Sequence, residues 1–232
     1  MVFYQSLDEV KNLRWKYYHT KFHYDACNPS IKATSAWIGH RPFAYDLVRF
    51  LKPQTIVELG THWGASFFCF CQAVSNAGTQ ATCFAVDTWR GDAHSGEYGE
   101  EIYNGVVEVA NRLYPDIAIL IRNTFDHALD LIEDGSVHLL HIDGFHTLEA
   151  VTHDFQSWLP KLAEHGVVLF HDIAVKEHGF GVYQLWEELK KQHPSLEFQH
   201  SSGLGVLFPK GTNKSINKIL SLKEEFQAIY TG

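Results

Sequence analysis

The sequence predicts an α/β protein with a doubly wound, Rossmann-like sheet of seven strands, the last strand antiparallel, and helices on both faces. The first observation is that short apolar runs of strand length alternate with helix-length segments from residue 55 onward. The second is that the runs at 137–142 and 167–170 flank one helix-length segment, and a strand–helix–strand unit of this size makes its two strands parallel. The third is that residues 196–208 hold two further runs around a Ser-Ser-Gly turn, which predicts a hairpin and therefore one antiparallel strand.

The individual elements follow from hydrophobic period and from residues that begin or end helices. Pro53 marks a break before the first strand, and Asn123 and Thr124 can cap the short helix that follows them. The segment 65–74 is apolar nearly all round, so we expect this helix to be buried. The predicted strands are 55–59, 82–86, 117–121, 137–142, 167–170, 196–200 and 205–208. The predicted helices are 36–51, 65–74, 102–113, 125–132, 147–162 and 179–191.

Three regions surround or interrupt this pattern. Residues 1–50 are expected to form an N-terminal helical extension before a main domain at 51–210. The amphipathic segment 211–232 is expected to form a C-terminal helix that packs on the domain or on the second subunit of a homodimer. The segment 88–101 is long and carries three glycines, which predicts a mobile loop or lid beside a site.

Composition limits the classes of partner and the compartment. The chain has 232 residues, a net charge of −8 and no cluster of lysine and arginine, which argues against non-specific nucleic-acid binding. No apolar run approaches the roughly 18 residues of a membrane span, and the N-terminus lacks the order of a signal peptide. The four cysteines are expected to be free thiols, which suggests a cytoplasmic protein.

The turn after the first predicted strand has the features of a ligand-binding turn. Gly60 and Gly64 stand between a strand and a helix, where backbone can approach a ligand and the helix N-terminus offers free N–H groups. Their spacing does not match the dinucleotide pattern G-x-G-x-x-G. Glu58 suits a cationic ligand better than a pyrophosphate, and Asp87 ends the second strand, where a carboxylate often accepts from ribose hydroxyls. The alternative is a structural turn with surface acids.

Acidic and imidazole side chains end the two strands of the central unit. Asp143 and Asp172 follow neighbouring parallel strands, so their carboxylates should meet at one sheet edge. Two close carboxylates repel unless a cation lies between them, and oxygen ligands favour Mg²⁺, Mn²⁺ or Ca²⁺. The alternative is that both acids cap loops or pair with Arg90 or Lys176. His138 and His141, inside a strand, are expected to be core histidines.

The stretches VELGTHWGAS, AVDTW, HIDGFH and LFHDI resemble class I S-adenosylmethionine-dependent methyltransferases. More narrowly, residues 56–208 resemble a bacterial branch that includes metal-dependent sugar O-methyltransferases. The resemblance implies a seven-stranded sheet whose last strand is antiparallel. It also implies a set of cofactor-binding residues around the amino acid part, the ribose and the adenine: Glu58, Gly60, Thr61, Gly64, Ser66, Asp87, Thr88, Trp89, Thr124 and Phe125.

The same resemblance assigns roles to the acid and imidazole groups. Asp143, His171 and Asp172 would hold the divalent metal, although His171 stands where relatives usually have an acid or an amide. His146 would be the general base, with Asp143 also in the catalytic set. For His146 the alternatives are helix capping or metal ligation.

These observations predict an S-adenosylmethionine-dependent O-methyltransferase with a divalent metal, Mg²⁺ or Mn²⁺, acting on a hydroxyl of a sugar, a glycan or a related small molecule. Two hypotheses from other classes stay open. Two histidines and one aspartate could form a non-haem iron site, as in an oxygenase. The fold could also serve as a non-catalytic cofactor-binding module.

Overall fold

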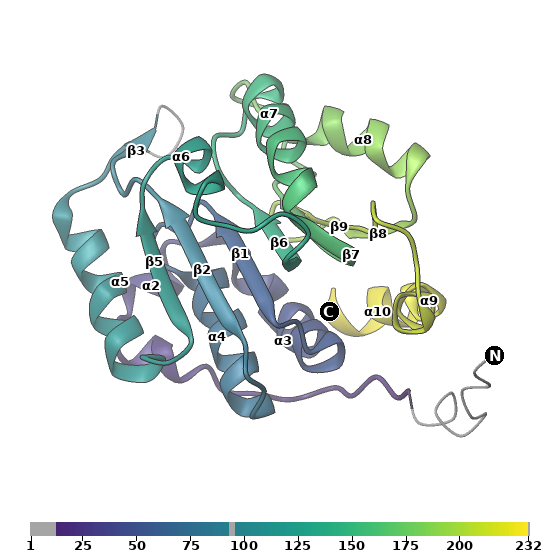
Figure 1. Ribbon diagram of the computed structural model, residues 1–232, viewed down its shortest axis with the longest axis horizontal. Helices are drawn as coiled ribbons and strands as arrows, with labels where there is room; N and C mark the ends of the chain where they lie inside the picture. The colour runs from purple at the N-terminus through teal and green to yellow at the C-terminus, as the bar shows by residue number, and fades with distance from the viewer. Residues whose placement is uncertain (1–12, 93–95, 232) are drawn as a thin grey trace.

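The computed structural model describes residues 13–92 and 96–231, and its centre is a seven-stranded sheet (Figure 1). The strand order is β5-β2-β1-β6-β7-β9-β8. β9 is antiparallel to both of its neighbours, and the other pairings in the sheet are parallel, so the predicted fold class is confirmed. The strands of this sheet are β1 Thr55–Leu59, β2 Thr82–Asp87, β5 Ala118–Arg122, β6 Val137–Ile142, β7 Leu162–His171, β8 Ser195–Phe198 and β9 Leu204–Leu207.

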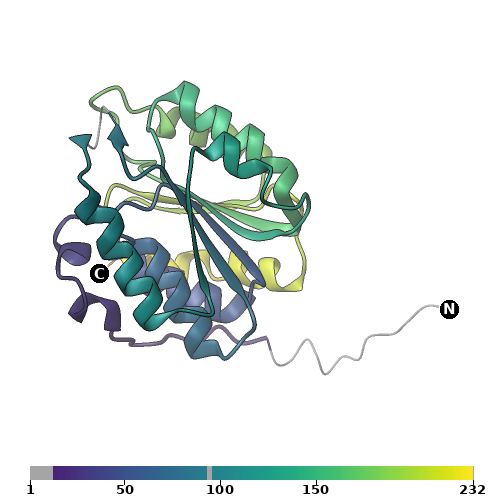
Figure 2. The same cartoon turned by 60° about the vertical axis from the view of Figure 1, so that its left-hand side comes forward.

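The sheet is the middle of three layers, with helices above and below it (Figure 2). Because side chains alternate along a strand, β1 contributes Ile56 to one hydrophobic cluster and Val57 and Leu59 to the other. One cluster packs α3 Arg41–Leu51, α4 Ala65–Ala77, α5 Glu100–Leu113, α9 Lys214–Ser221 and α10 Lys223–Tyr230 on one face. The other packs α6 Phe125–Leu129, α7 Leu148–Trp158 and α8 Val182–Gln192 on the opposite face. None of the helices within the described ranges is long and apolar enough to cross a membrane.

The registers of the parallel strands bring four strand ends to one edge of the sheet. Leu59 of β1 pairs with Val86 of β2 and with Ile142 of β6, and Ile142 pairs with Phe170 of β7. The residues that follow these strands therefore meet at a single edge, which is where open α/β sheets bind ligands.

The prediction of helix throughout residues 1–50 is wrong for much of the described part; residues 1–12 lie outside it. Residues 13–22 have no regular secondary structure, and only short turns of helix follow before α3: η1 His23–Ala26, α2 Ser30–Ala33 and η2 Ala36–His40. Tertiary packing prevails over helix propensity here, because aromatic side chains attach this segment to the helices beneath it. The Trp15 ring lies 5.9 Å from the Phe43 ring of α3 and 4.5 Å from the Phe226 ring of α10.

The C-terminal segment forms two short helices, α9 and α10, where one was predicted. Both pack on the body of the domain through buried Ile216, Ile219 and Phe226. The indole nitrogen of Trp15 donates to the hydroxyl of Tyr230 at 2.9 Å, and this hydroxyl donates to Asp46. The chain's two end segments are therefore joined in one buried network, and a role in a homodimer stays a prediction.

The loop predicted at residues 88–101 contains a small antiparallel pair, β3 Gly91–Asp92 and β4 Gly96–Glu97. Residues 93–95 lie outside the described part of the chain, and α5 begins at Glu100. The function of this segment as a lid stays a prediction.

Candidate cofactor and metal site

A cavity of about 370 Å³ opens at the edge where the four strand ends meet. This volume lies within the range of small-molecule pockets in proteins, roughly 300–1,000 Å³. Eleven residues predicted for the site line it: Gly60, Thr61, Ser66, Asp87, Thr88, Thr124, Phe125, Asp143, His146, His171 and Asp172. Three residues predicted to bind the cofactor do not: Glu58, Gly64 and Trp89.

The turn after β1 is held tightly against the neighbouring strands. Gly60 has φ +87°, and a Cβ at this position would lie 2.0 Å from the backbone oxygen of Asp143. The Gly60 N–H donates to Val86 at 3.0 Å, and the Asp143 N–H donates to Leu59 at 2.9 Å. Only glycine fits here, because a side chain would have to push β1 and β6 apart.

Gly64 lies outside the cavity lining and allows α4 to begin where it does, and its predicted role in cofactor binding stays a prediction. It has φ +85° and is the residue before the first turn of α4, where a Cβ would lie 2.6 Å from the Phe68 ring. The glycine therefore lets the helix begin directly behind the turn. This brings Ala65 and Ser66 to the cavity wall at the helix N-terminus, where backbone N–H groups lack helical partners.

The carboxylate of Asp87 organises this turn. Its Oδ2 accepts from the backbone N–H groups of Thr61 at 2.8 Å and His62 at 3.0 Å, and its Oδ1 accepts from Trp89 N–H at 2.7 Å. A carboxylate has about four acceptor positions, so about one remains for a ligand. Asp87 lines the cavity as predicted, but three of its hydrogen bonds serve the protein itself.

Trp89 and Glu58 act from behind the cavity wall. The Trp89 indole donates to the backbone oxygen of His62 at 3.0 Å and its ring lies 5.0 Å from that of Tyr103, so it fastens the turn. Glu58 is fully buried, and its Oε2 lies 2.9 Å from Nδ1 of His141. Burial raises the pKa of Glu58, and the contact with His141 opposes this effect. His141 is a buried core histidine, as expected.

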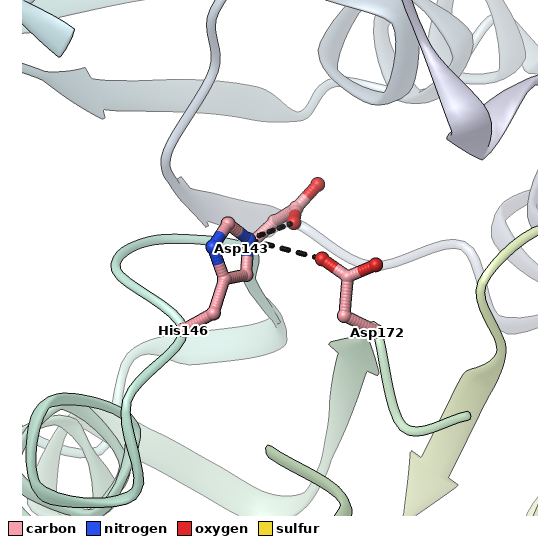
Figure 3. A group of neighbouring side chains, drawn as sticks. All are labelled: Asp143, His146 and Asp172. Atoms are coloured by element: carbon pink, nitrogen blue, oxygen red, sulfur yellow. Dashed lines mark ion pairs between the residues drawn. The ribbon is translucent and has the colours of Figure 1, made fainter. Parts of the chain in front are cut away.

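The acid and imidazole groups predicted at the edge do come together. His146 Nε2 lies 3.0 Å from Asp172 Oδ2 and 3.8 Å from Asp143 Oδ1 (Figure 3). The three side chains point toward one another, and one ligand atom from each lies within 4.8 Å of the others. Two carboxylates and one imidazole this close have the composition of a divalent metal site.

His171 reaches the same carboxylates from another direction. Its Nδ1 lies 3.2 Å from Asp143 Oδ1 and 3.4 Å from Asp172 Oδ2, and its Nε2 lies 3.0 Å from the backbone oxygen of Ser201. A carbonyl oxygen can only accept, so Nε2 carries a proton and Nδ1 is the nitrogen turned to the carboxylates. A backbone carbonyl that fixes the outer nitrogen is the common arrangement around metal-ligating histidines. Either imidazole can therefore supply a third ligand.

Opposite charges stabilise one another in this cluster. Burial opposes ionisation of Asp143, but the positive charge of His171 and hydrogen bonds from both imidazoles outweigh it and hold the pKa of Asp143 well below its usual range. The pKa of Asp172 is lowered in the same way. Burial would lower the pKa of His146, but hydrogen bonds to Asp143 and Asp172 raise it to about 9. The pKa of His171 is also raised, by the same two carboxylates against the effect of burial.

Part of the cavity wall was not predicted. Thr34, Ser35 and Ala36 reach it from the N-terminal segment, and the rings of His62 and Tyr98 stack 4.6 Å apart on another side. His62 stands in the glycine turn and could have been included on that ground. Tyr98 lies in the segment 88–101, which was predicted to flank a site. The other three residues carry no local signal, since their positions depend on long-range packing.

Residues 57–173, about half of the chain, match the family model described as a methyltransferase domain. A curated relative, the uncharacterized protein y4gI of Sinorhizobium fredii, is 56% identical over 174 residues, which are 75% of this chain and 19% of that protein. The chain thus spans about a fifth of the length of this relative.

Solved structures share the fold at low sequence identity. A methyltransferase of Geobacter sulfurreducens is 12% identical with a TM-score of 0.60, covering 81% of this chain and 90% of its own. The O-methyltransferase of Bacillus cereus, solved in complex with SAH (S-adenosylhomocysteine), is 13% identical with a TM-score of 0.59, covering 82% and 91%. The SAH-bound methyltransferase PaMTH1 of Podospora anserina is 14% identical with a TM-score of 0.56, covering 79% and 93%.

Proposed function

Since the chain belongs to this methyltransferase-domain family, we propose that it is an S-adenosylmethionine-dependent enzyme that transfers the methyl group to a hydroxyl oxygen, with the help of a divalent metal. The proposed acceptor is a sugar, a glycan or a related small molecule with neighbouring hydroxyls. The observation that carries this proposal is the cluster of Asp143, His146 and Asp172 on the wall of the cavity.

Features of the cavity wall support a cofactor with a nucleoside and an amino acid part. Gly60 and Thr61 line the cavity, so the backbone of the turn after β1 is within reach of a ligand. The hydroxyl of Thr61 is buried beside the cavity and has no hydrogen-bond partner in the described part of the chain. A buried polar atom of this kind usually has a partner, so it fits a site that a polar ligand completes.

The donor set supports a divalent metal. Asp143 and Asp172 would be shared ligands, with His171 as the predicted third ligand and His146 as the alternative. Carboxylates suit Mg²⁺ and Mn²⁺, and an imidazole in the set favours Mn²⁺ of the two. When bound, such a cation supplies positive charge that stabilises alkoxide character on the acceptor oxygen.

His146 is proposed as the general base. An acceptor hydroxyl must lose its proton as the methyl group arrives, and a positioned imidazole can take it. With its pKa at about 9, His146 is protonated at neutral pH as long as no metal is bound to the carboxylates of Asp143 and Asp172. Positive charge bound to these carboxylates would weaken their hold on the proton, so the base and the metal are proposed to work together.

A divalent metal held by two carboxylates could bind two neighbouring oxygens of one acceptor, so the proposed site suits a diol. The O-methyltransferase of Bacillus cereus shares the fold, which supports oxygen as the methylated atom without identifying the acceptor. The hypothesis of an iron oxygenase loses its support, because the matching family is one of methyltransferases. The hypothesis of a non-catalytic module loses support for the same reason.

Methyl transfer from radiolabelled S-adenosylmethionine tests the proposal. The acceptor panel should contain monosaccharides and glycosides with vicinal hydroxyls, catechols, and analogues in which one of the two hydroxyls is already methylated. We expect transfer to a diol, loss of transfer with EDTA, and recovery with Mn²⁺ or Mg²⁺. Full activity in EDTA would remove the metal from the proposal, and transfer to nitrogen or carbon acceptors alone would exclude the hydroxyl.

A further inference from the structure

Three buried side chains form a polar relay behind the cofactor side of the cavity. Trp37 of η2 donates from its indole nitrogen to Nε2 of His141 at 3.1 Å. Nδ1 of His141 lies 2.9 Å from Oε2 of Glu58. Glu58 and His141 are register partners on β1 and β6, so their side chains lie on the same face of the sheet. All three side chains are essentially inaccessible to solvent.

The order of donors and acceptors in this relay is fixed by its first member. An indole N–H can only donate, so Nε2 of His141 must accept. The ring proton of His141 then sits on Nδ1, which donates to the carboxylate of Glu58. The Phe70 ring meets the Trp37 ring edge-on at 5.7 Å and the His141 ring edge-on at 5.7 Å, so packing holds both rings in this arrangement.

The relay ends in a carboxylate oxygen, Oε1 of Glu58, that makes no hydrogen bond of normal geometry within the described part of the chain. This oxygen is buried. Leaving a buried acceptor of this kind unpaired is costly, so a donor from outside the protein would recover free energy. The Ser66 hydroxyl is close enough to Glu58 to favour its charged form, and Ser66 lines the cavity, so the carboxylate lies next to the cavity wall.

The other end of the relay, Trp37, is hydrogen-bonded to a residue of the cavity wall. The Ser35 hydroxyl accepts from the backbone N–H of Trp37 at 3.2 Å, and Ser35 and Ala36 line the cavity. The N-terminal wall and the carboxylate behind the glycine turn are therefore parts of one hydrogen-bonded unit.

We propose that Trp37 and His141 are positioning residues that orient the Glu58 carboxylate toward the ammonium group of the cofactor's amino acid part. This inference rests on the proposed function and on the cofactor-binding role that the family resemblance implies for Glu58. Neither Trp37 nor His141 touches the ligand; each acts through the next member of the relay. A purely structural role, in which the three side chains only fill the core, is the alternative that an experiment must exclude.

Equilibrium binding of two ligands separates these roles. S-adenosylhomocysteine carries the ammonium group, whereas 5′-methylthioadenosine has the same nucleoside without the amino acid part. Trp37→Phe keeps an aromatic ring and removes the N–H, so we expect the Kd for S-adenosylhomocysteine to rise about tenfold, the effect of about 1.4 kcal/mol. The Kd for methylthioadenosine should stay within about twofold.

Substitutions at His141 test the donor order directly. In His141→Gln the amide oxygen can accept from Trp37 and the amide nitrogen can donate to Glu58, so this variant should bind S-adenosylhomocysteine nearly as the wild type does. His141→Met fills similar space without either hydrogen bond and should show the tenfold loss. Trp158→Phe is the matched control, since Trp158 is buried and its indole nitrogen has no hydrogen-bond partner in the described part of the chain.

Melting temperatures without ligand accompany each titration. The proposal is overturned if both ligands lose affinity equally, if His141→Gln is as weak as His141→Met, or if Trp37→Phe binds S-adenosylhomocysteine as the wild type does. Wild-type binding in Glu58→Gln would remove the role of Glu58 itself. Wild-type binding of the cofactor without methylation of any hydroxyl would instead refute the proposed acceptor and leave the relay in place.

Discussion

Replacement of Asp87 by asparagine is expected to loosen the glycine turn and, through it, the cofactor site. The wild-type carboxylate accepts three backbone N–H groups, from Thr61 and His62 on one oxygen and from Trp89 on the other. Asparagine has one acceptor oxygen, so it can serve one side only and turns an NH₂ donor toward the N–H on the other side.

The magnitude follows from these three bonds. Hydrogen bonds to a charged group contribute about 1.5–3 kcal/mol each, against about 0.5–1.5 for neutral pairs. Asp87→Asn weakens two bonds and removes the third at Trp89, which is 1% exposed, so we expect a loss of roughly 2–4 kcal/mol in the free energy of unfolding. For a chain of this size, each kcal/mol shifts the Tm by about 2–4 °C, so the Tm should fall by about 4–16 °C.

Thermal unfolding with and without S-adenosylhomocysteine is the assay. Asp116→Asn makes the same chemical change on an exposed loop residue and should alter stability by less than about 0.5 kcal/mol. Saturating ligand should raise the Tm of both variants by mass action. An Asp87→Asn protein with the wild-type Tm and a tenfold weaker Kd would refute the reasoning, because the carboxylate would then act on the ligand and not on the turn.

Other predictions concern the base, the turn and a buried acid. His146→Ala should lower turnover by about 10²–10⁴-fold and leave the Kd of S-adenosylhomocysteine unchanged. The remaining activity should no longer rise with pH, because in the wild type that rise comes from deprotonation of the imidazole. Loss of Mn²⁺ binding in this variant would make His146 a metal ligand instead of the base. Gly60→Ala should lower the free energy of unfolding by at least about 1–3 kcal/mol, because its Cβ would meet the Asp143 backbone. Gly78→Ala is the control and should cost less, since Gly78 has φ +63° and nothing lies within 4 Å of its Cβ. Equal Tm values for the two variants would contradict the clash at Gly60. Burial raises the pKa of Asp154 to about 7 in the folded protein, whereas the unfolded chain loses this proton near pH 3.8. The stability of the wild type should therefore fall as the pH rises from about 3.8 to about 7. Asp154→Asn should remove that fall, with a higher Tm than the wild type at pH 8 and no gain at pH 4; parallel Tm profiles would exclude Asp154 as the source.

The sheet edge was predictable because its signals are local. Each strand is a short apolar run, and parallel strands joined by helices must end at the same edge, so Asp143 and Asp172 could be placed together from sequence alone. The geometry supports that expectation, with both carboxylates within reach of His146. Their roles as ligands remain predictions.

The differences between the predicted site and the residues that line the cavity have equally physical causes. Glu58 and Ile56 are two residues apart on β1, so their side chains lie on the same face of the sheet, the one covered by α4, and Glu58 stays behind the cavity wall. Thr34 and Ser35 reach the cavity only because Trp37 and its neighbours pack on elements far along the chain. Hydrophobic period carries no information about such contacts, since they depend on the complete fold.

The position of β9 has a consequence for the order in which the protein can be assembled on the ribosome. β9 is the last strand to be synthesised, yet it lies between β7 and β8 and is the only strand that β8 contacts in the described sheet. A nascent chain that has reached β8 therefore has an unpaired segment and an open edge on β7, with no correct pairing available to either. Unpaired strand edges are where partly folded chains aggregate. We therefore expect release of chains halted between β8 and β9 to give insoluble protein, and expect the arrival of residues 204–207 to be the step that commits the nascent chain to its native topology.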